Sequence, residues 1–136
     1  MHHPIHLTMR NVLSILVTCC LLACSGSVIA QQPTLVAVTV DYRALPGQGA
    51  ALHAALQPLL TEVRKEPHYL GITVLRDALA DPDRILLVER WADQSYYTGA
   101  HSSTPHLEAF KAVAMPLLAG PPAVTLWPGV EEVGRP

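Results

Sequence analysis

The order in which the apolar segments change periodicity constrains this 136-residue chain more than any other feature. Four segments rich in Val, Leu and Ile alternate with a period of two, which is typical of strands. Two longer segments repeat apolar residues every three or four positions, which is typical of helices. The resulting order, β-α-β-β-α-β, predicts an α+β domain of the ferredoxin-like plan, with one four-stranded antiparallel sheet and its helices on one face. The expected elements are strands over 35–43, 69–76, 84–91 and 123–127, helices over 48–65 and from Thr104 onward, and a short helical stretch over 93–99.

Local signals predict where these elements begin and end. Glu66 and Pro67 end the first helix, because a residue before proline avoids the α region. The Asp-Pro-Asp stretch at 81–83 predicts the turn between the second and third strands. Thr104 is placed to cap the second long helix with its hydroxyl, and Val113 falls on the apolar stripe of that helix.

The second face of the predicted sheet also carries apolar side chains. Alternate positions of the first and third strands point away from the helices, and several of them are apolar. Because both helices lie on the other face, this face needs a separate cover. We therefore expect a homodimer that forms through the sheet face. The apolar residues concerned are Leu35, Ala37, Leu86 and Val88.

The first thirty residues differ from the rest and predict an export signal. A positive start at Arg10 precedes an apolar run over 12–22, which is too short to span a bilayer, since that takes roughly 20 apolar residues. Small residues up to Ala30 predict cleavage there, which leaves a periplasmic or secreted domain over 31–136. Alternatively, the Leu-Leu-Ala-Cys stretch ending at Cys24 resembles a lipoprotein box, and a lipid on that cysteine would anchor the protein to a membrane.

Cysteines and charges narrow the possible partners. All three cysteines lie in the leader, so a chain cleaved after Ala30 has no disulfide. Arg10 is the only Asp, Glu, Lys or Arg of the leader, so eight basic and eleven acidic residues follow it, and the net charge of that part is three negative. These interspersed charges argue against a nucleic-acid partner. His101 and His106 lie five residues apart rather than four, and with no cysteine available we expect no metal site.

Three short motifs are spread over most of the chain. They are Arg64-Lys65-Glu66-Pro67, then Leu87-Val88-Glu89-Arg90-Trp91, then His101 followed by Ser103-Thr104-Pro105-His106. Together they resemble the antibiotic-biosynthesis-monooxygenase domains, which include the quinol-monooxygenase-like proteins. That family reads Arg-x-Glu-Pro-Gly-Cys, later Glu-x-Trp, and later His-x-x-Ser-Pro-His-Phe. The resemblance covers about residues 35–127.

The resemblance implies a dimeric α+β barrel, in which two sheets pack face to face and each subunit has a pocket between its sheet and its helices. It also implies activity on aromatic or quinol-like molecules with dioxygen and without a metal or flavin cofactor. His68 and Tyr69 stand where the family has Gly-Cys, which changes the entry to the second strand. The related haem-degrading branch is rejected, because its Asn, Trp and His positions hold Val40, His101 and Lys111 here.

His101 is the candidate catalytic base. Oxygenation without a cofactor needs a substrate carbanion that passes an electron to dioxygen, so a base must first remove a phenolic or enolic proton. An imidazole exchanges protons near neutral pH, and His101 lies in the link between the short and the long helix. The alternative role is a hydrogen bond to a helix end.

The candidate substrate-binding residues are aromatic or imidazole side chains. Trp91 either stacks on a flat ligand or fills the core of the domain. His106 lies in the first helical turn, where the helix dipole disfavours an imidazolium, and it either orients the substrate or covers that turn. The tyrosines either turn their phenol groups toward a pocket or pack as ordinary amphipathic side chains. The full set is Trp91, His106, Tyr42, Tyr69 and Tyr96.

Three functions fit this sequence. The first is a cofactor-independent monooxygenase acting on a quinol-like or polyphenolic small molecule. The second is an isomerase or lyase that uses the same base without oxygen. The third is a non-enzymatic periplasmic module that binds a small ligand, because a fold alone does not fix a function.

Overall fold

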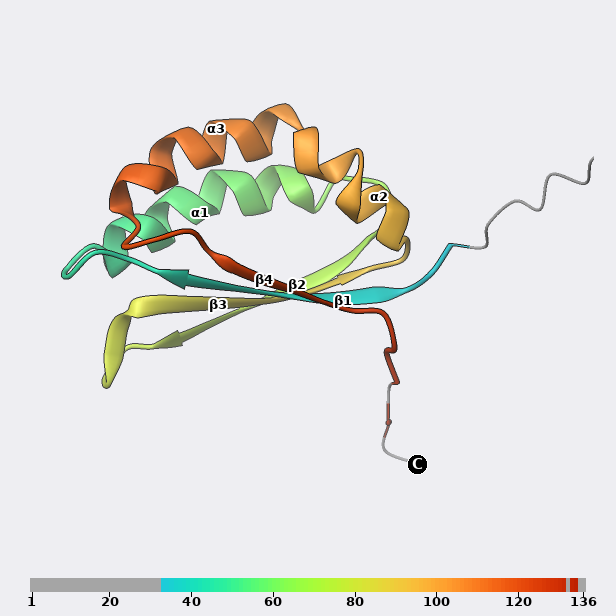
Figure 1. Ribbon diagram of the computed structural model, residues 1–136, viewed down its shortest axis with the longest axis horizontal. Helices are drawn as coiled ribbons and strands as arrows, with labels where there is room; N and C mark the ends of the chain where they lie inside the picture. Colours follow the sequence, from blue (N-terminus) through green and yellow to red (C-terminus); the bar gives the residue numbers. More distant parts are fainter. Residues whose placement is uncertain (1–32, 132, 135–136) are drawn as a thin grey trace, which may run out of the picture. The chain divides into compact units, whose positions relative to one another are not determined.

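Four strands form one antiparallel sheet in the computed structural model, which describes residues 33–131 and 133–134 (Figure 1). The strands follow the spatial order β2-β3-β1-β4. Figure 1 shows that the long helices α1 and α3 lie over the same face of this sheet. The predicted ferredoxin-like α+β fold is therefore confirmed. The elements are β1 (Val36–Arg43), α1 (Gly49–Val63), β2 (Tyr69–Asp77), β3 (Asp81–Trp91), α2 (Gln94–Thr98), η1 (His101–Ser103), α3 (Pro105–Ala114), η2 (Met115–Leu117) and β4 (Ala123–Trp127).

The predicted export signal lies outside the described residues. This applies to the cleavage site after Ala30 and to the lipid site at Cys24 alike. Within the part of the chain that is described, no helix has both the length and the apolar character needed to cross a membrane.

Alternation along the two central strands places one set of side chains under the helices. Val36, Val38 and Val40 of β1 are at most 4 % exposed, and Ile85 and Leu87 of β3 are at most 1 % exposed. The helices supply the opposite wall of the core through Leu52, Leu56, Leu59 and Val63 of α1 and Phe110 and Ala114 of α3. A period of two in the strands and of 3.6 in the helices is thus enough to build this core.

The hairpin between β2 and β3 differs from the prediction. The turn lies at 78–80, and residues 81–83 already belong to β3. Asp77 stabilises the turn, because its carboxylate accepts from the backbone N–H groups of residues 79 and 80. Asp83 instead accepts from the backbone N–H groups of Gly47 and Gly49, at 2.9 and 2.8 Å, and so holds the start of α1. A Cβ at Gly49 would lie 2.0 Å from the carbonyl oxygen of Pro82, so only glycine fits there.

Two expectations for α3 are wrong. The Val113 side chain is 58 % exposed, because the buried stripe of the helix runs through Phe110 and Ala114. Thr104 occupies the N-cap position, but its hydroxyl donates to the carbonyl oxygen of His101 at 3.0 Å instead of accepting from a helix N–H. That contact ties the start of α3 to η1.

The second face of the sheet is partly apolar. Ala37, Leu86 and Val88 are partly buried on it. Leu75 of β2 and Trp127 of β4 are 46 % and 52 % exposed, and they add to the apolar residues there. A homodimer through this face stays a prediction.

Candidate active site

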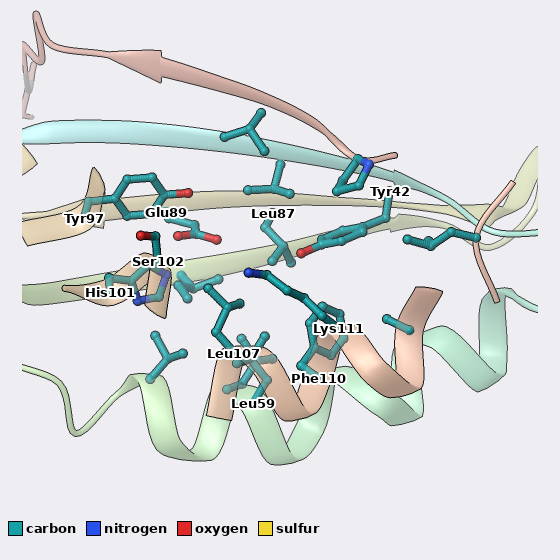
Figure 2. Close-up of a pocket in the computed structure, with 18 of the residues that line it drawn as sticks. Tyr42, Leu59, Leu87, Glu89, Tyr97, His101, Ser102, Leu107, Phe110 and Lys111 are labelled. Carbon is teal, nitrogen blue, oxygen red and sulfur yellow. The ribbon is translucent and has the colours of Figure 1, made fainter. Parts of the chain in front are cut away.

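A cavity of about 360 Å³ lies between the sheet and the helices (Figure 2). A volume of this size suits a small organic ligand. Glu89, Tyr97, His101 and Ser102 lie together at one end of it in Figure 2. The rest of the lining is mostly apolar and includes Phe110, Ala114, Met115, Leu118, Pro122 and Val124, with Tyr42 and Lys111 among its polar members. The cavity therefore has one strongly polar end in an otherwise largely apolar lining.

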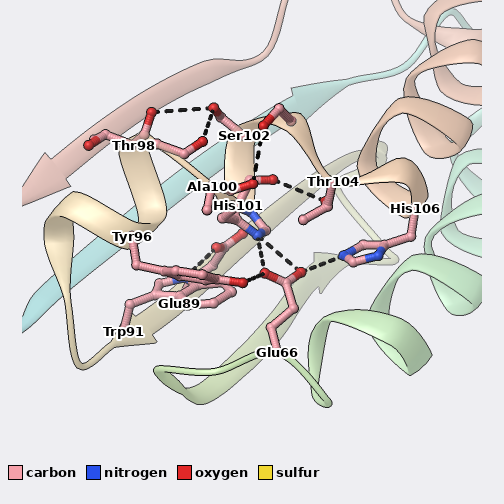
Figure 3. Close-up of polar contacts among 12 residues, drawn as sticks. Glu66, Glu89, Trp91, Tyr96, Thr98, Ala100, His101, Ser102, Thr104 and His106 are labelled. Atoms are coloured by element: carbon pink, nitrogen blue, oxygen red, sulfur yellow. Dashed lines mark hydrogen bonds and ion pairs between the residues drawn. The ribbon is translucent and has the colours of Figure 1, made fainter.

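Glu66 is the centre of a hydrogen-bond network beside the polar end (Figure 3). Its Oε2 accepts from Nδ1 of His101 at 2.9 Å and from the Tyr96 hydroxyl at 3.0 Å. Its Oε1 accepts from Nε2 of His106. The side chain is 6 % exposed. One buried carboxylate thus joins the segment after α1 to α2, η1 and α3.

The protonation of Glu66 follows from these contacts. Burial raises the pKa of this carboxyl, but the hydrogen bonds from His101, His106 and Tyr96 outweigh burial and hold the pKa below its usual value. A carboxylate only accepts hydrogen bonds, so both histidine nitrogens that face it carry a proton. Glu66 is therefore an anion that fixes which nitrogen of each ring is protonated.

The segment after α1 places Glu66 by an unusual backbone conformation. The N–H of Glu66 still bonds the carbonyl oxygen of Val63 at 3.0 Å, so the residue continues the last helical turn. His68 then takes a φ of 68°, in the left-handed region that favours glycine. Its carbonyl oxygen accepts from the N–H of Ala92 at 2.8 Å, and its ring lies 5.0 Å from that of Tyr96. The glycine of the family pattern is thus replaced here by a histidine that makes contacts of its own.

Glu89 is the second buried carboxyl at this end. It lies on β3 between Leu87 and Trp91 on the helix side of the sheet, and it is 6 % exposed. Its Oε2 accepts from the indole Nε1 of Trp91 at 2.9 Å. Burial raises the pKa of Glu89 to about 7, with a smaller rise from the charge of Glu66, while the Trp91 bond opposes both. Near neutral pH this carboxyl therefore exchanges a proton readily.

His101 is enclosed by aromatic rings. It is 7 % exposed, stacks on Tyr97 with ring centroids 5.0 Å apart, and lies 4.5 Å from the ring of Trp91. It also lines the cavity. Because Nδ1–H is directed at Glu66, the lone pair of the neutral ring is on Nε2. A histidine held in this tautomer is suited to accept a proton from a bound hydroxyl.

The structure separates the predicted site residues into two groups. Tyr42 and His101 line the cavity. The others lie outside its lining and support it from behind. Trp91 is fully buried and binds Glu89, Tyr69 packs edge-on against Trp91 at 5.9 Å, and Tyr96 and His106 both bond Glu66.

Sequence reasoning missed three residues of this site, namely Glu66, Glu89 and Tyr97. A period of two would have found Glu89, because it shares its strand face with Leu87 and Trp91. Tyr97 is not in the predicted substrate-binding set, although it lies beside Tyr96 in the same short helical stretch. Glu66 stands in the Arg-x-Glu-Pro motif, but that motif does not show its role, because its partners are 30, 35 and 40 residues away in the sequence.

A metal centre needs several ligating side chains that converge on one point. Within 33–131 and 133–134, no group of three or more His, Cys, Asp and Glu side chains is arranged to hold a metal ion. Glu66, His101 and His106 meet through direct hydrogen bonds from nitrogen to oxygen.

The fold and the cavity define a class of protein, namely a small ferredoxin-like domain with a ligand site between its sheet and its helices. Within that class, the family model described as antibiotic biosynthesis monooxygenase matches residues 35–113. The chain therefore belongs to the antibiotic biosynthesis monooxygenase family. A search of the curated proteins gives no match.

Solved structures agree with this assignment. The chain is 27 % identical to Rv0793 from Mycobacterium tuberculosis, with a TM-score of 0.65, and the match covers 74 % of this chain and 100 % of the other. It is also 27 % identical to a structure from Chloroflexus aurantiacus named for antibiotic biosynthesis monooxygenase, with a TM-score of 0.60 and coverage of 74 % and 98 %. A structure from Nitrosomonas europaea with the same family name matches at 20 % identity and a TM-score of 0.66, with coverage of 76 % and 97 %, and shows the fold.

Proposed function

We propose that this protein is a monooxygenase that oxidises a quinol-like or polyphenolic small molecule in the cavity, without a metal or organic cofactor. The observation that carries the proposal is the placement of His101. It lines a largely apolar cavity while a buried carboxylate holds its Nδ1–H. Membership of the family supports the class of reaction.

In this proposal His101 is the base. Nε2 takes the proton of a substrate hydroxyl, and the imidazolium that forms is stabilised by the Glu66 carboxylate at 2.9 Å from Nδ1. The rings of Tyr97 and Trp91 both pack against the imidazole and restrict its motion. Because the ring is held before the substrate binds, little reorganisation accompanies the proton transfer.

The electrons come from the substrate itself. The deprotonated quinol reduces dioxygen, and one oxygen atom becomes bonded to a ring carbon while the other leaves as water. Two hydrogens of the quinol end in that water, so quinol and dioxygen give a hydroxyquinone and water. The apolar walls of the cavity exclude water from the reactive anion.

The test is oxygen uptake by the purified protein with a panel of quinols and polyphenols. We expect His101→Ala to reduce turnover by about a hundredfold or more, as is usual for loss of a general base. His106→Ala is the matched control, because His106 also bonds Glu66 but lies outside the cavity lining. It is expected to keep most of the turnover.

Three outcomes would contradict the proposal. Equal turnover in wild type and His101→Ala would show that His101 is not the catalytic base. Turnover without oxygen would favour an isomerase or lyase. A ligand that co-purifies and binds wild type and His101→Ala equally, with no turnover, would favour a binding module.

We also propose that the active form is a homodimer through the second face of the sheet. The exposed side chains of Leu75 and Trp127 there support the proposal. A cover over apolar surface is favourable because it removes that surface from water. Sedimentation showing a monomer at micromolar concentration would contradict it.

For the leader we propose export, with either cleavage after Ala30 or lipidation at Cys24. The short positive start and apolar run support it. The mass of the mature protein distinguishes the two forms, because a lipidated N-terminus begins at the cysteine. A mature protein that retains the leader would contradict both.

A further inference from the structure

Glu89 places a carboxyl group at the cavity wall with few hydrogen-bond partners. It lines the cavity from β3, and among the described residues its side chain has one hydrogen bond, from the Trp91 indole to Oε2. Trp91 is fully buried, so its N–H serves Glu89 and is not offered to a ligand. The other carboxyl oxygen is left for whatever occupies the cavity.

We propose that Glu89 binds the ligand directly, its carboxyl donating a hydrogen bond to an oxygen atom of an aromatic molecule held at the same end of the cavity as His101. The site then selects molecules with two oxygens at that end. One is an acidic hydroxyl that faces His101, and the other is a carbonyl or second phenol oxygen that accepts from Glu89. The inference rests on the proposed function, because it specifies the substrate class of the same site.

The charged groups around Glu89 favour its neutral carboxyl, which can donate a hydrogen bond, over its carboxylate. The nearest charged group that acts on it is the Glu66 carboxylate, whose negative charge opposes a second one. Tyr42 from β1 and Tyr97 from α2 face it as phenols, and the pKa of each phenol is raised by burial first and by Glu89 second. Its neighbours across the sheet are Ile72 of β2 and Val38 of β1. The cavity that it lines is also bounded by the His101 ring from η1, by Leu59, Leu60 and Val63 of α1, and by Leu107 of α3.

The one lysine of the cavity lining does not neutralise Glu89. Lys111 of α3 lines the cavity, but its Nζ bonds Glu108 at 2.7 Å. Without a cationic partner, burial favours the neutral acid, and the pKa of Glu89 is raised to about 7. A neutral carboxyl donates an ordinary hydrogen bond to a ligand oxygen, whereas the carboxylate would repel a carbonyl oxygen, which cannot donate to it.

The shape of the cavity sets the rest of the ligand. Glu89, Tyr97, His101 and Ser102 gather at the end near α2 and η1 (Figure 2), while most of the other lining residues, among them Met115, Leu118 and Val124, are apolar. A ligand that fills it therefore has a polar aromatic head and an apolar body. A molecule with charges at both ends would leave one of them without a partner.

Binding of a matched set of probes tests the inference, and turnover is not needed. The probes are α-tetralone, which carries one carbonyl oxygen, tetralin, which has none, and an aminotetralin, which is a cation. Each is titrated calorimetrically into wild type, Glu89→Gln and Glu89→Leu at about pH 6 and about pH 8.5. Circular dichroism checks that each variant is folded.

Wild type is expected to prefer α-tetralone over tetralin by about tenfold at the lower pH, which is the effect of one hydrogen bond. The preference falls as pH rises through the pKa of about 7, because the donor proton is lost. Glu89→Gln keeps the preference at both values, since its amide N–H always donates. Glu89→Leu shows no preference at either.

The opposite results overturn the inference. They are equal binding of α-tetralone and tetralin by wild type at the lower pH, or a preference that survives in Glu89→Leu. Tight binding of the aminotetralin at the higher pH, lost in Glu89→Gln, would show that Glu89 is an anionic site for amines. Because no oxygen is consumed, failure of the oxygen-uptake experiment leaves this result standing, and the reverse also holds.

Discussion

Glu66 and Glu89 are two buried carboxyls beside the same cavity, and their surroundings shift their pKa values in opposite directions. Each side chain loses its hydration, which disfavours the charged form in both. Glu66 receives hydrogen bonds from His101, His106 and Tyr96, whereas Glu89 receives one from Trp91. Burial therefore does not decide the charge of a carboxyl by itself. The number of donors that reach it does.

The largest expected effect comes from removal of the Glu66 carboxylate. Glu66→Ala leaves two histidines and a tyrosine without their shared acceptor, and we expect the free energy of unfolding to fall by about 3 to 5 kcal/mol. Urea denaturation measures it. The control is Glu62→Ala, because Glu62 is exposed and bonds only Lys65 on the helix surface. If both variants lose the same stability, the network does not hold the elements together.

Glu89→Gln is expected to raise the free energy of unfolding, and to do so only at high pH. The folded-state pKa of about 7 exceeds the usual 4.5, so the folded protein binds more protons between these values and loses stability as pH rises through them. The variant removes this loss and is expected to be more stable than wild type by about 3 kcal/mol near pH 8, and equal to it near pH 4.5.

Glu66 gives the opposite pH dependence, because its pKa is lowered. Its contribution is present above the usual pKa of 4.5 and is lost as pH falls below that value. Thermal unfolding measured as a function of pH follows both effects, namely the loss of stability at low pH through Glu66 and the loss at high pH through Glu89. A Glu89→Gln variant with the same pH profile as wild type would contradict the difference between the two carboxyls.

Trp91→Phe tests the single donor of Glu89. The change deletes the indole N–H and part of a buried ring, so we expect a loss of about 2 kcal/mol. Because the Trp91 bond lowers the pKa of Glu89, the midpoint of the high-pH loss of stability moves upward. Trp127→Phe is the matched control, since its indole bonds Thr39 on the exposed face of the sheet. An unchanged midpoint in Trp91→Phe would show that the bond does not set the pKa.

Tyr96→Phe is expected to have the smallest effect. It removes one of three donors to Glu66, so we expect a loss of about 1 kcal/mol and a pKa of Glu66 closer to its usual value. Tyr97→Phe is the control, because that ring stacks on His101 while its hydroxyl is not bonded to Glu66. Acid denaturation compares the stability of the Tyr96→Phe and Tyr97→Phe variants as pH falls. A larger acid shift in Tyr97→Phe would mean that the Tyr96 hydroxyl is not a donor of consequence.

Most of the fold could be predicted, because periodicity is a local property. Alternation in the strands and helical spacing in α1 placed the elements in their correct order. The hairpin was misplaced because the Asp-Pro-Asp stretch at 81–83 has the composition of a turn. Its last aspartate instead binds the N–H groups of Gly47 and Gly49, a contact between residues 34 to 36 positions apart.

The site was predicted less completely. His101 and Tyr42 line the cavity. His101 was predicted from its residue type and from the family pattern, and Tyr42 from its residue type alone. Trp91 was expected at a ligand wall or in the core, and the structure places it in the core, bonded to Glu89. Glu66 was predicted to end a helix and to belong to a family motif, but not to take part in the site, since the groups that surround it come from α2, η1 and α3.

The sequence by itself determined the alternation that sends Glu89 and Trp91 to the helix side and the order of elements that makes one sheet. It also supplied the two carboxyls and the histidines. Only the tertiary structure decided which carboxyl is charged, because protonation depends on donors that arrive from distant segments. Three donors meet Glu66 and one meets Glu89, and that difference is a property of the packing of the helices on the sheet.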